Sequence, residues 1–191
     1  MTQRWGTGGR RLAAGAAALL ALAAAGGCSG TSGPAPSKSV PASQTSKAPA
    51  PMTLTSSAFS DNGVIPAAYT CDAASGAAVS PPLRWSAPPA GTAWLALYAY
   101  DNTGAVIHWI VVNLKPGVTA LASGSAGGGV EVANYLPMCP GVGNTDQYQF
   151  TVYAEPAGYH LPKIGASYAV DPSALAAHAL GIGTLHGIYS Q

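Results

Sequence analysis

The chain has 191 residues, of which eight are Lys or Arg and seven are Asp or Glu, so only 8% are charged and the formal net charge is +1. Ordinary soluble domains carry about 25% charged residues. A protein that binds nucleic acid through its phosphates needs clustered cations, so this scarcity of charge argues against nucleic acid as a partner. The charges are also unevenly placed, because residues 1–51 hold five bases and no acid, whereas residues 52–191 hold three bases and seven acids.

Residues 1–27 are predicted to be a signal peptide. Three arginines precede the uncharged run 12–25, which is shorter than the roughly 20 residues that a permanent membrane-spanning helix needs. The alternative is a buried Ala/Leu helix of the folded domain, but no amphipathic pattern follows the run. We therefore expect export of the chain.

Cleavage after Gly27 would make Cys28 the first residue of the mature chain. The segment Ala25-Gly26-Gly27-Cys28 resembles the lipobox of bacterial lipoproteins, although lipoboxes prefer Leu where Ala25 stands. In a lipobox the small residues enter the signal-peptidase groove and the thiol takes a diacylglycerol. We predict a lipid on Cys28 that anchors the protein to the cell membrane, facing the extracytoplasmic side. The alternative is a secreted protein with a spare thiol.

Residues 28–51 are predicted to be a disordered tether. They are rich in Ser, Pro and Ala, contain no aromatic residue, and have Val40 as the only large aliphatic side chain. Such a segment cannot bury enough apolar surface to offset the entropy lost on ordering. Residues 52–191 are then long enough for one folded domain.

Three segments of that domain have the pattern of β-strands. Residues 93–100 are apolar on both faces, residues 106–114 are rich in β-branched side chains, and residues 148–155 alternate as if one face were wet. The compact turn sequence 101–104 predicts that the first two strands form an antiparallel hairpin.

One helix is predicted near the end of the chain. Asp171 is the expected N-cap, Pro172 lies in the first turn, and Gly181 is the expected stop. A closing strand is expected over 184–190. A mostly β chain with one short helix indicates a β-sandwich or barrel with Greek-key connections.

The sequence contains no nucleophile elbow, zinc-protease helix motif, P-loop or dinucleotide fingerprint. The four histidines are scattered, so neither a metal nor a cofactor is expected. Cys71 and Cys139 form an even pair in an exported domain, which favours a disulfide. The alternative is two separate buried thiols, because sequence alone does not supply the separation of the two residues.

Several segments occur in the order and spacing of the phosphatidylethanolamine-binding protein family, and the chain resembles most its bacterial Raf-kinase-inhibitor-like branch. These segments are 69–72, 80–85, 108–113, 138–140, 148–154 and 185–189. The resemblance implies an antiparallel β-sandwich with one or two short peripheral helices, and a small anion-accepting pocket at one end. By position, the pocket residues are Asp101, His108, Pro140 and Tyr148, with Cys139 beside them.

The residue types suit a pocket for a phosphate or phospholipid head group. His108 and Tyr148 supply hydrogen-bond donors, and Asp101 either orients His108 or meets an ammonium group. Strict strand alternation places His108 on one face with Ile110 and Val112, so a satisfied core histidine is the alternative to a ligand-binding one.

Two departures from the family pattern weaken the expected anion pocket. The first conserved region is shortened to the turn 101–105, and Asp146-Gln147 stand where the family has His-Arg. Losing two cations and gaining an acid weakens phosphate binding, so phosphatidylethanolamine itself is not the expected ligand.

Three hypotheses follow for function. The preferred one is a lipid-anchored binding module for a small anionic or amphiphilic ligand near Asp101, His108 and Tyr148. The second is a protease- or kinase-inhibitor-like module that binds an unknown protein through its surface and keeps a vestigial pocket. An enzyme is not expected, because no nucleophile with an adjacent base is visible.

Overall fold

A computed structural model describes residues 47–74 and 76–191. The predicted signal peptide 1–27, the lipidation site Cys28 and most of the tether lie outside these residues. The described residues are mostly β-strand, with one α-helix and one short 3-10 helix, η1 (Ala67–Tyr69). No helix among them is long and apolar enough to cross a membrane.

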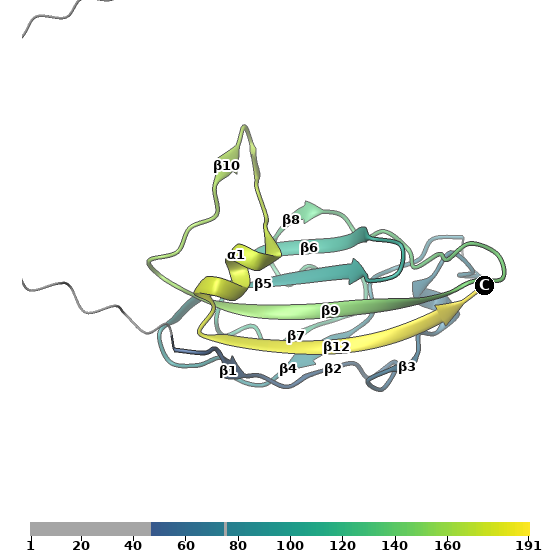
Figure 1. The fold of residues 1–191 in the computed structure, drawn as a ribbon, viewed down its shortest axis with the longest axis horizontal. Helices are drawn as coiled ribbons and strands as arrows, with labels where there is room; N and C mark the ends of the chain where they lie inside the picture. Colours follow the sequence, from purple (N-terminus) through teal and green to yellow (C-terminus); the bar gives the residue numbers. More distant parts are fainter. Residues whose placement is uncertain (1–46, 75) are drawn as a thin grey trace, which may run out of the picture. The chain divides into compact units, whose positions relative to one another are not determined.

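The larger sheet runs in the order β1-β12-β9-β5-β6-β8, with β3 beside β12 (Figure 1). The predicted hairpin is confirmed, because the neighbouring strands β5 and β6 pair antiparallel. The order β9-β5-β6-β8 is that of a Greek key, in which the fourth strand returns to lie beside the first. The strands of this sheet are β1 (Ala50–Pro51), β3 (Gly63–Val64), β5 (Thr92–Asp101), β6 (Val106–Leu114), β8 (Val130–Ala133), β9 (Thr145–Pro156) and β12 (Gly181–Ser190).

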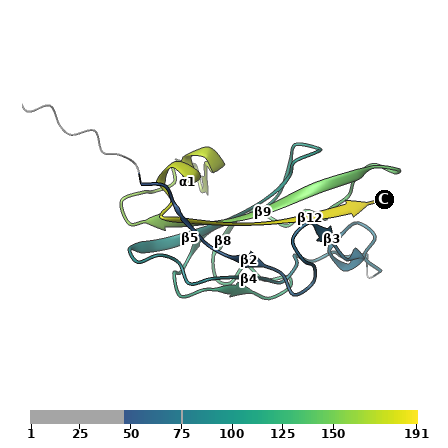
Figure 2. The same ribbon diagram turned by 60° about the horizontal axis from the view of Figure 1, so that its bottom comes forward.

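A smaller sheet of β2 (Leu54–Thr55), β4 (Leu83–Trp85) and β7 (Ala120–Leu121) completes the predicted β-sandwich. Figure 2 shows β2 and β4 lying along one face of the larger sheet. Alternate side chains of β5 and β9, such as Leu97 and Phe150, form a buried core with Leu83 and Trp85 of the smaller sheet. Two very short strands, β1 and β3, pair parallel with β12, so the larger sheet is not purely antiparallel.

The other face of the larger sheet is also covered, contrary to the wet face expected for residues 148–155. Helix α1 (Pro172–His178) lies over β9 (Figure 1) and packs its fully buried Leu175 against a second apolar cluster on this face. A small antiparallel pair, β10 (Lys163–Ile164) and β11 (Ser167–Tyr168), precedes it in the chain. Residues 150–155 are therefore buried on both faces.

Helix α1 begins as predicted but ends earlier. The Asp171 carboxylate accepts a hydrogen bond of 2.8 Å from the backbone N–H of Ser173, which satisfies a free donor at the helix start. The helix ends at His178 instead of near Gly181, because the backbone N–H of Leu180 donates to Ala154 of β9. The chain is thereby drawn into β12 three residues before the predicted strand.

The folded part begins slightly before residue 52. The backbone N–H groups of Ala50 and Met52 donate to Leu180 and Ile182, at 2.8 Å each. Pro51, which has no N–H, falls between these two donors and costs the edge strand no hydrogen bond. Ala50 and Pro51, placed in the tether by composition, thus pair with β12.

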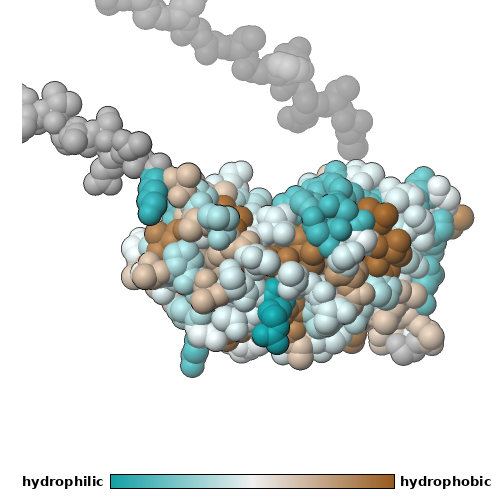
Figure 3. Space-filling model, turned by 90° about the horizontal axis from the view of Figure 1, so that it is seen from below, coloured by the Kyte–Doolittle hydropathy of each residue, from teal (hydrophilic) through white to brown (hydrophobic). Residues whose placement is uncertain are grey.

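The scarcity of charge is visible on the surface. Seen from below (Figure 3), weakly polar residues dominate, with few strongly hydrophilic ones between separate hydrophobic areas. The one ion pair among the described residues joins His186 and Asp61, 3.4 Å apart.

Candidate functional site

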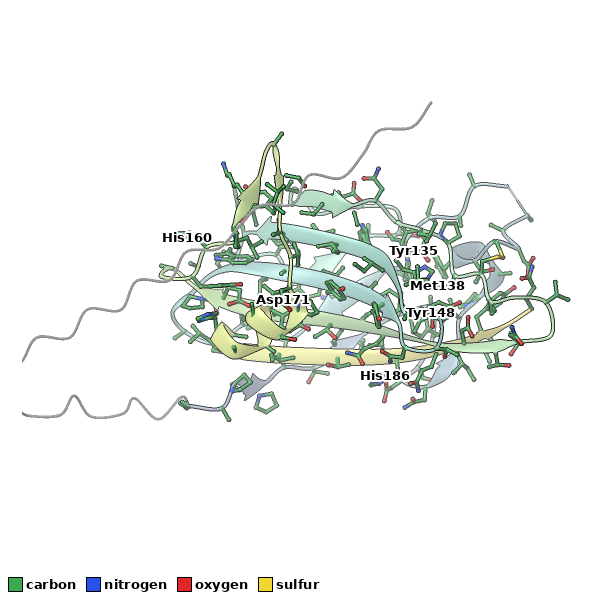
Figure 4. All side chains as sticks on the ribbon, turned by 45° about the horizontal axis from the view of Figure 1, so that its top comes forward. Tyr135, Met138, Tyr148, His160, Asp171 and His186 are labelled. Carbon is green, nitrogen blue, oxygen red and sulfur yellow. A yellow bond between two sulfur atoms is a disulfide. The ribbon has the colours of Figure 1, made fainter. Side chains whose placement is uncertain are left out.

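Three of the predicted site residues lie at one end of the larger sheet. Asp101 ends β5, His108 is near the start of β6, and Tyr148 is near the start of β9, so antiparallel pairing brings them together. Asp101 and Tyr148 are direct cross-strand partners. Figure 4 shows Tyr148 at this end, with Asp171 and His160 toward the other.

A β-bulge orients His108. Ala99 pairs with Trp109, but the next residue of β5, Tyr100, pairs with Ile107, so His108 is the extra residue. Bulges of this kind redirect a side chain and are common next to functional sites. The expectation from strict alternation was therefore wrong: the His108 ring does not join the outer cluster.

His108 instead contacts the inner core. Its ring meets that of Tyr148 edge to face, with centroids 5.1 Å apart and planes at 90°. Its Nδ1 lies 2.9 Å from the carbonyl oxygen of Leu136. Because a carbonyl only accepts hydrogen bonds, Nδ1 carries the proton. The described residues make no hydrogen bond to Nε2, which is left available to a ligand.

Asp101 does not orient His108, as one expectation held; the backbone of Leu136 does. One oxygen of Asp101 accepts hydrogen bonds from the backbone N–H groups of Thr103 at 2.7 Å and Gly104 at 2.9 Å, which closes the β5–β6 turn. A Cβ on Gly104 would lie 2.6 Å from the second oxygen. The turn therefore needs glycine at this position, and the Asp101 side chain, itself buried, is held in place.

Asp146 lies beside Asp101 and faces the same end of the sheet. Its pKa is raised by desolvation first and then by its interaction with the neighbouring Asp101 carboxyl group, whereas His108 lowers it. The acid that replaces a cation of the family pattern is thus part of the site.

The Tyr148 hydroxyl is buried and has no hydrogen-bond partner among the described residues. Burial raises the pKa of Tyr148, and the charges of Asp101 and Asp146 raise it further. The backbone of Cys139 acts in the other direction and lowers the pKa of Tyr148, but it makes no hydrogen bond to the Tyr148 hydroxyl. A buried hydroxyl without a partner costs free energy, so the site contains an unsatisfied polar group.

Cys139 and the buried Pro140 come to the site on the segment after β8. A disulfide joins Cys71 to Cys139, with 5.4 Å between their Cα atoms, which confirms the predicted pairing. Thr70 and Met138 form a parallel bridge beside it, and the backbone N–H of Cys71 donates to Met138 at 3.1 Å. These contacts hold the Cys139 segment against residues 70–71, with the backbone of Cys139 near the Tyr148 hydroxyl of β9.

A family model described as phosphatidylethanolamine-binding protein matches residues 55–190. The chain belongs to this family. A Mycobacterium tuberculosis (strain H37Rv) protein named "Putative lipoprotein LppC" is 38% identical over 192 residues, covering 91% of this chain and 93% of its own. A Chlamydia muridarum family relative named UPF0098 protein is 34% identical over 152 residues, covering 73% of this chain and 99% of its own.

Solved structures of the family have the same fold. The Chlamydia trachomatis homologue CT736 is 31% identical and superposes with a TM-score of 0.59, covering 73% of this chain and 97% of its own. YbcL of E. coli, described as a member of the PEBP family, superposes with a TM-score of 0.61 over 73% of this chain and 98% of its own, at 24% identity.

Sequence reasoning missed two contacts at this end of the family fold. The Tyr189 hydroxyl donates to the carboxylate of Asp72, and the Tyr135 hydroxyl donates to the backbone oxygen of Tyr69 at 2.6 Å. The first joins Asp72, next to Cys71, to β12, and the second joins the segments that carry Cys71 and Cys139 to each other. Tyr189 and Asp72 are 117 residues apart in the sequence, and no local pattern signals such a pair.

The predicted site residues of this family member lie apart from the larger cavities of the described part. Four cavities of about 290 to 460 Å³ in the described part are lined by other residues. No group of three potential metal ligands occurs among the described residues. Neither Asp101 nor Asp146 has an ion-pair partner there.

Proposed function

We propose that this chain is a lipid-anchored, extracytoplasmic binding protein of the phosphatidylethanolamine-binding family. Its site, built from Asp101, His108, Pro140 and Tyr148, holds a small polar ligand or the head group of an amphiphile. The binding is reversible and involves no chemical conversion, because the site pairs no nucleophile with a base.

The observation that carries this proposal is the pair of unused polar atoms in the site. The buried Tyr148 hydroxyl lacks a partner, and the hydrogen bond that the described residues make to the neighbouring His108 ring is at Nδ1, so Nε2 is not used by them. Buried polar groups are normally satisfied. A bound ligand that hydrogen-bonds both atoms would satisfy the site.

The proposal that the chain is anchored by a lipid rests on Cys28 and on the name of a mycobacterial relative. The alignment with the mycobacterial protein covers 91% of this chain, and that protein is named a lipoprotein. The disulfide between Cys71 and Cys139 is consistent with an oxidising, extracytoplasmic compartment. Mass spectrometry of the membrane-extracted protein tests this directly, since acylated Cys28 is expected and an unmodified thiol would contradict it.

A titration followed by NMR tests the pocket. Phosphate, acetate and phosphoethanolamine are added to the purified full chain while the His108 ring resonances are recorded. At least one ligand should shift them saturably at millimolar concentration, while the resonances of the remote His160 stay unchanged. If none of them perturbs His108, the pocket is not a binding site.

One observation favours the second hypothesis, a surface that binds a protein. Val142 is 88% exposed and Leu136 is 47% exposed, and both lie in the segment that carries Cys139 and Pro140. In a pull-down from envelope extracts, Val142→Asp should then reduce capture of a partner, whereas His108→Ala should not. Equal capture by Val142→Asp and the native chain would reject this alternative.

A further inference from the structure

A cavity of about 370 Å³ lies beside His160, toward the end of the larger sheet opposite Tyr148 (Figure 4). We propose that this cavity binds a small aromatic carboxylate, with the carboxylate at Lys163 and the ring against Trp94. The inference goes beyond the proposed function, because it concerns a separate cavity with other residues. The lining residues are Trp94, Asn113, His160, Leu161, Lys163 and Tyr168.

A second β-bulge in β6 brings Asn113 to this cavity. Between the partners of Leu95 and Leu97, β6 has two residues where β5 has one, and Asn113 is the second of them. Asn113 has a φ of 58°, in the left-handed region that residues other than glycine seldom adopt. Bulges and unusual backbone conformations cluster at binding sites, where they aim a side chain. Here they direct a polar amide to the cavity.

The β10–β11 pair supplies the positive charge of the cavity. Lys163 and Tyr168 are direct cross-strand partners, and Nζ of Lys163 lies 5.8 Å from the centroid of the Tyr168 ring. Nδ2 of Asn113 donates to the Tyr168 hydroxyl at 3.1 Å, which joins the pair to β6. Lys163 has no acidic partner among the described residues. Its charge is therefore left for a ligand.

Trp94 forms an aromatic wall that is held in place by its neighbours. Its Nε1 donates to the carbonyl oxygen of Tyr159 at 3.1 Å. The Trp94 and Tyr159 rings stack with 6.0 Å between centroids and 18° between planes. Tyr159 stacks in turn on His178 of α1, at 4.2 Å. Because the wall is set before a ligand arrives, binding orders few additional groups.

The charge at the cavity favours a ligand with one negative charge. Lys163 lines the cavity, and no Asp or Glu of the described residues does. Glu155 pairs with Trp94 across the strands but is buried and is not part of the lining. One ammonium matches a monocarboxylate, whereas a phosphate dianion would keep an unbalanced charge. The amide of Asn113 and the ring of His160 are further hydrogen-bonding groups.

The remaining walls favour a ring on the same ligand. Trp94 and Tyr168 supply aromatic rings, and Leu161 supplies aliphatic surface. Aromatic rings attract one another in offset or edge-to-face arrangements. The volume lies at the lower end of the range of small-molecule pockets, which suits one ring with a short acidic arm. Such a ligand uses both the charge and the walls, whereas acetate or an uncharged aromatic uses only one of them.

Titration of the full chain with phenylacetate at pH 7 tests the inference, with the Trp94 indole and His160 ring resonances recorded by NMR. Phenylacetate should shift both saturably at millimolar concentration. Acetate and phosphate lack the ring and 2-phenylethanol lacks the charge, so all three should leave both resonances unchanged. Equal binding of 2-phenylethanol would overturn the inference, and so would the absence of any response to phenylacetate. A response of His108 alone would overturn it and leave the proposed function standing.

Matched variants locate the effect. Lys163→Met should weaken phenylacetate binding about tenfold or more, since it removes a charged donor, and Lys163→Arg should restore most of it. Arg84→Met removes one positive charge from the exposed side of the smaller sheet, so its affinity should equal that of the native chain. Equal affinity of Lys163→Met and Arg84→Met would contradict the inference.

Asn113→Gly tests the bulge separately from the charge. Glycine adopts the left-handed conformation without strain, so the fold and its thermal unfolding should be preserved while the amide is lost. Binding of phenylacetate should weaken about threefold, as expected for the loss of a neutral hydrogen bond. Unchanged binding in a variant that unfolds at the native temperature would show that Asn113 serves only the strand.

Discussion

The ring of His108 meets the ring of Tyr148 edge to face, 5.1 Å between centroids, because a β-bulge in β6 turns the histidine toward the inner core. The contact sets the His108 ring beside the ring whose buried hydroxyl has no hydrogen-bond partner among the described residues. The family resemblance assigned both residues to a pocket, but the bulge determines that they touch.

Removal of the Tyr148 hydroxyl separates a structural role from a ligand-binding one. Tyr148→Phe deletes a buried hydroxyl that has no partner. We expect the free energy of unfolding to stay equal or to rise by up to about 1 kcal/mol, because a desolvation cost disappears. Urea denaturation measures this change. Binding of whichever of phosphate, acetate or phosphoethanolamine shifts the His108 resonances should weaken in the same variant, and a loss of stability without loss of binding would show that the hydroxyl serves only the fold.

Glu155 should make the protein less stable as the pH rises toward neutrality. Its carboxylate is fully buried opposite Trp94 without a hydrogen-bond partner, and burial raises its pKa from 4.5 to about 7. The unfolded chain then loses this proton at lower pH than the folded one does. The stabilising contribution of protonated Glu155 is present below about pH 4.5 and is lost as the pH rises through about 7.

Glu155→Gln tests this by removing the titration. The free energy of unfolding is measured for the variant and for the native chain at each pH. Between pH 4.5 and pH 8, the variant should gain stability relative to the native chain by on the order of 2 kcal/mol. Urea denaturation at a series of pH values measures it. Asp171→Asn, which changes an exposed cap, is the control. A difference that does not vary with pH would contradict a raised pKa at Glu155.

The disulfide should hold the site segment in place. Cys71→Ser with Cys139→Ser removes a link between residues 68 apart, and loop closure of that length is worth about 2–4 kcal/mol. We expect thermal unfolding at lower temperature and faster amide hydrogen exchange at Met138 and Tyr148. Reduction of the native chain with dithiothreitol should reproduce both effects, and unchanged exchange would mean that the segment is held by its other contacts.

Gly104 should be sensitive to a single methyl group. A Cβ there would approach one Asp101 oxygen to 2.6 Å, and Asp101 cannot move without losing its turn hydrogen bonds. Gly104→Ala should therefore destabilise the protein by about 1–3 kcal/mol and shift the His108 resonances. Gly158→Ala is the matched control, because nothing lies within 4 Å of its added Cβ. Equal stability of the two variants would contradict this account of the turn.

Local sequence determined much of the framework. Apolar patterning and the turn after Asp101 were sufficient for the β5–β6 hairpin, and Asp171 with Pro172 were sufficient for the start of α1. These features depend on neighbours within a few residues, through side-chain alternation, turn chemistry and capping. The predicted disulfide needed only cysteine number and compartment, and the structure supplied its geometry.

Tertiary structure decided the features on which binding depends. The bulge that orients His108 is a mismatch between two strands, so it has no signature in β6 alone. Asp146 lies near Asp101 only because β9 returns to pair with β5. Glu155 is buried because the segment after β9 and helix α1 cover the face of β9 that the alternating sequence pattern predicted to be exposed to solvent. Sequence thus determined the strands and the candidate residues, whereas pairing between distant strands determined which of their side chains meet, because only the tertiary fold brings β5, β6 and β9 side by side.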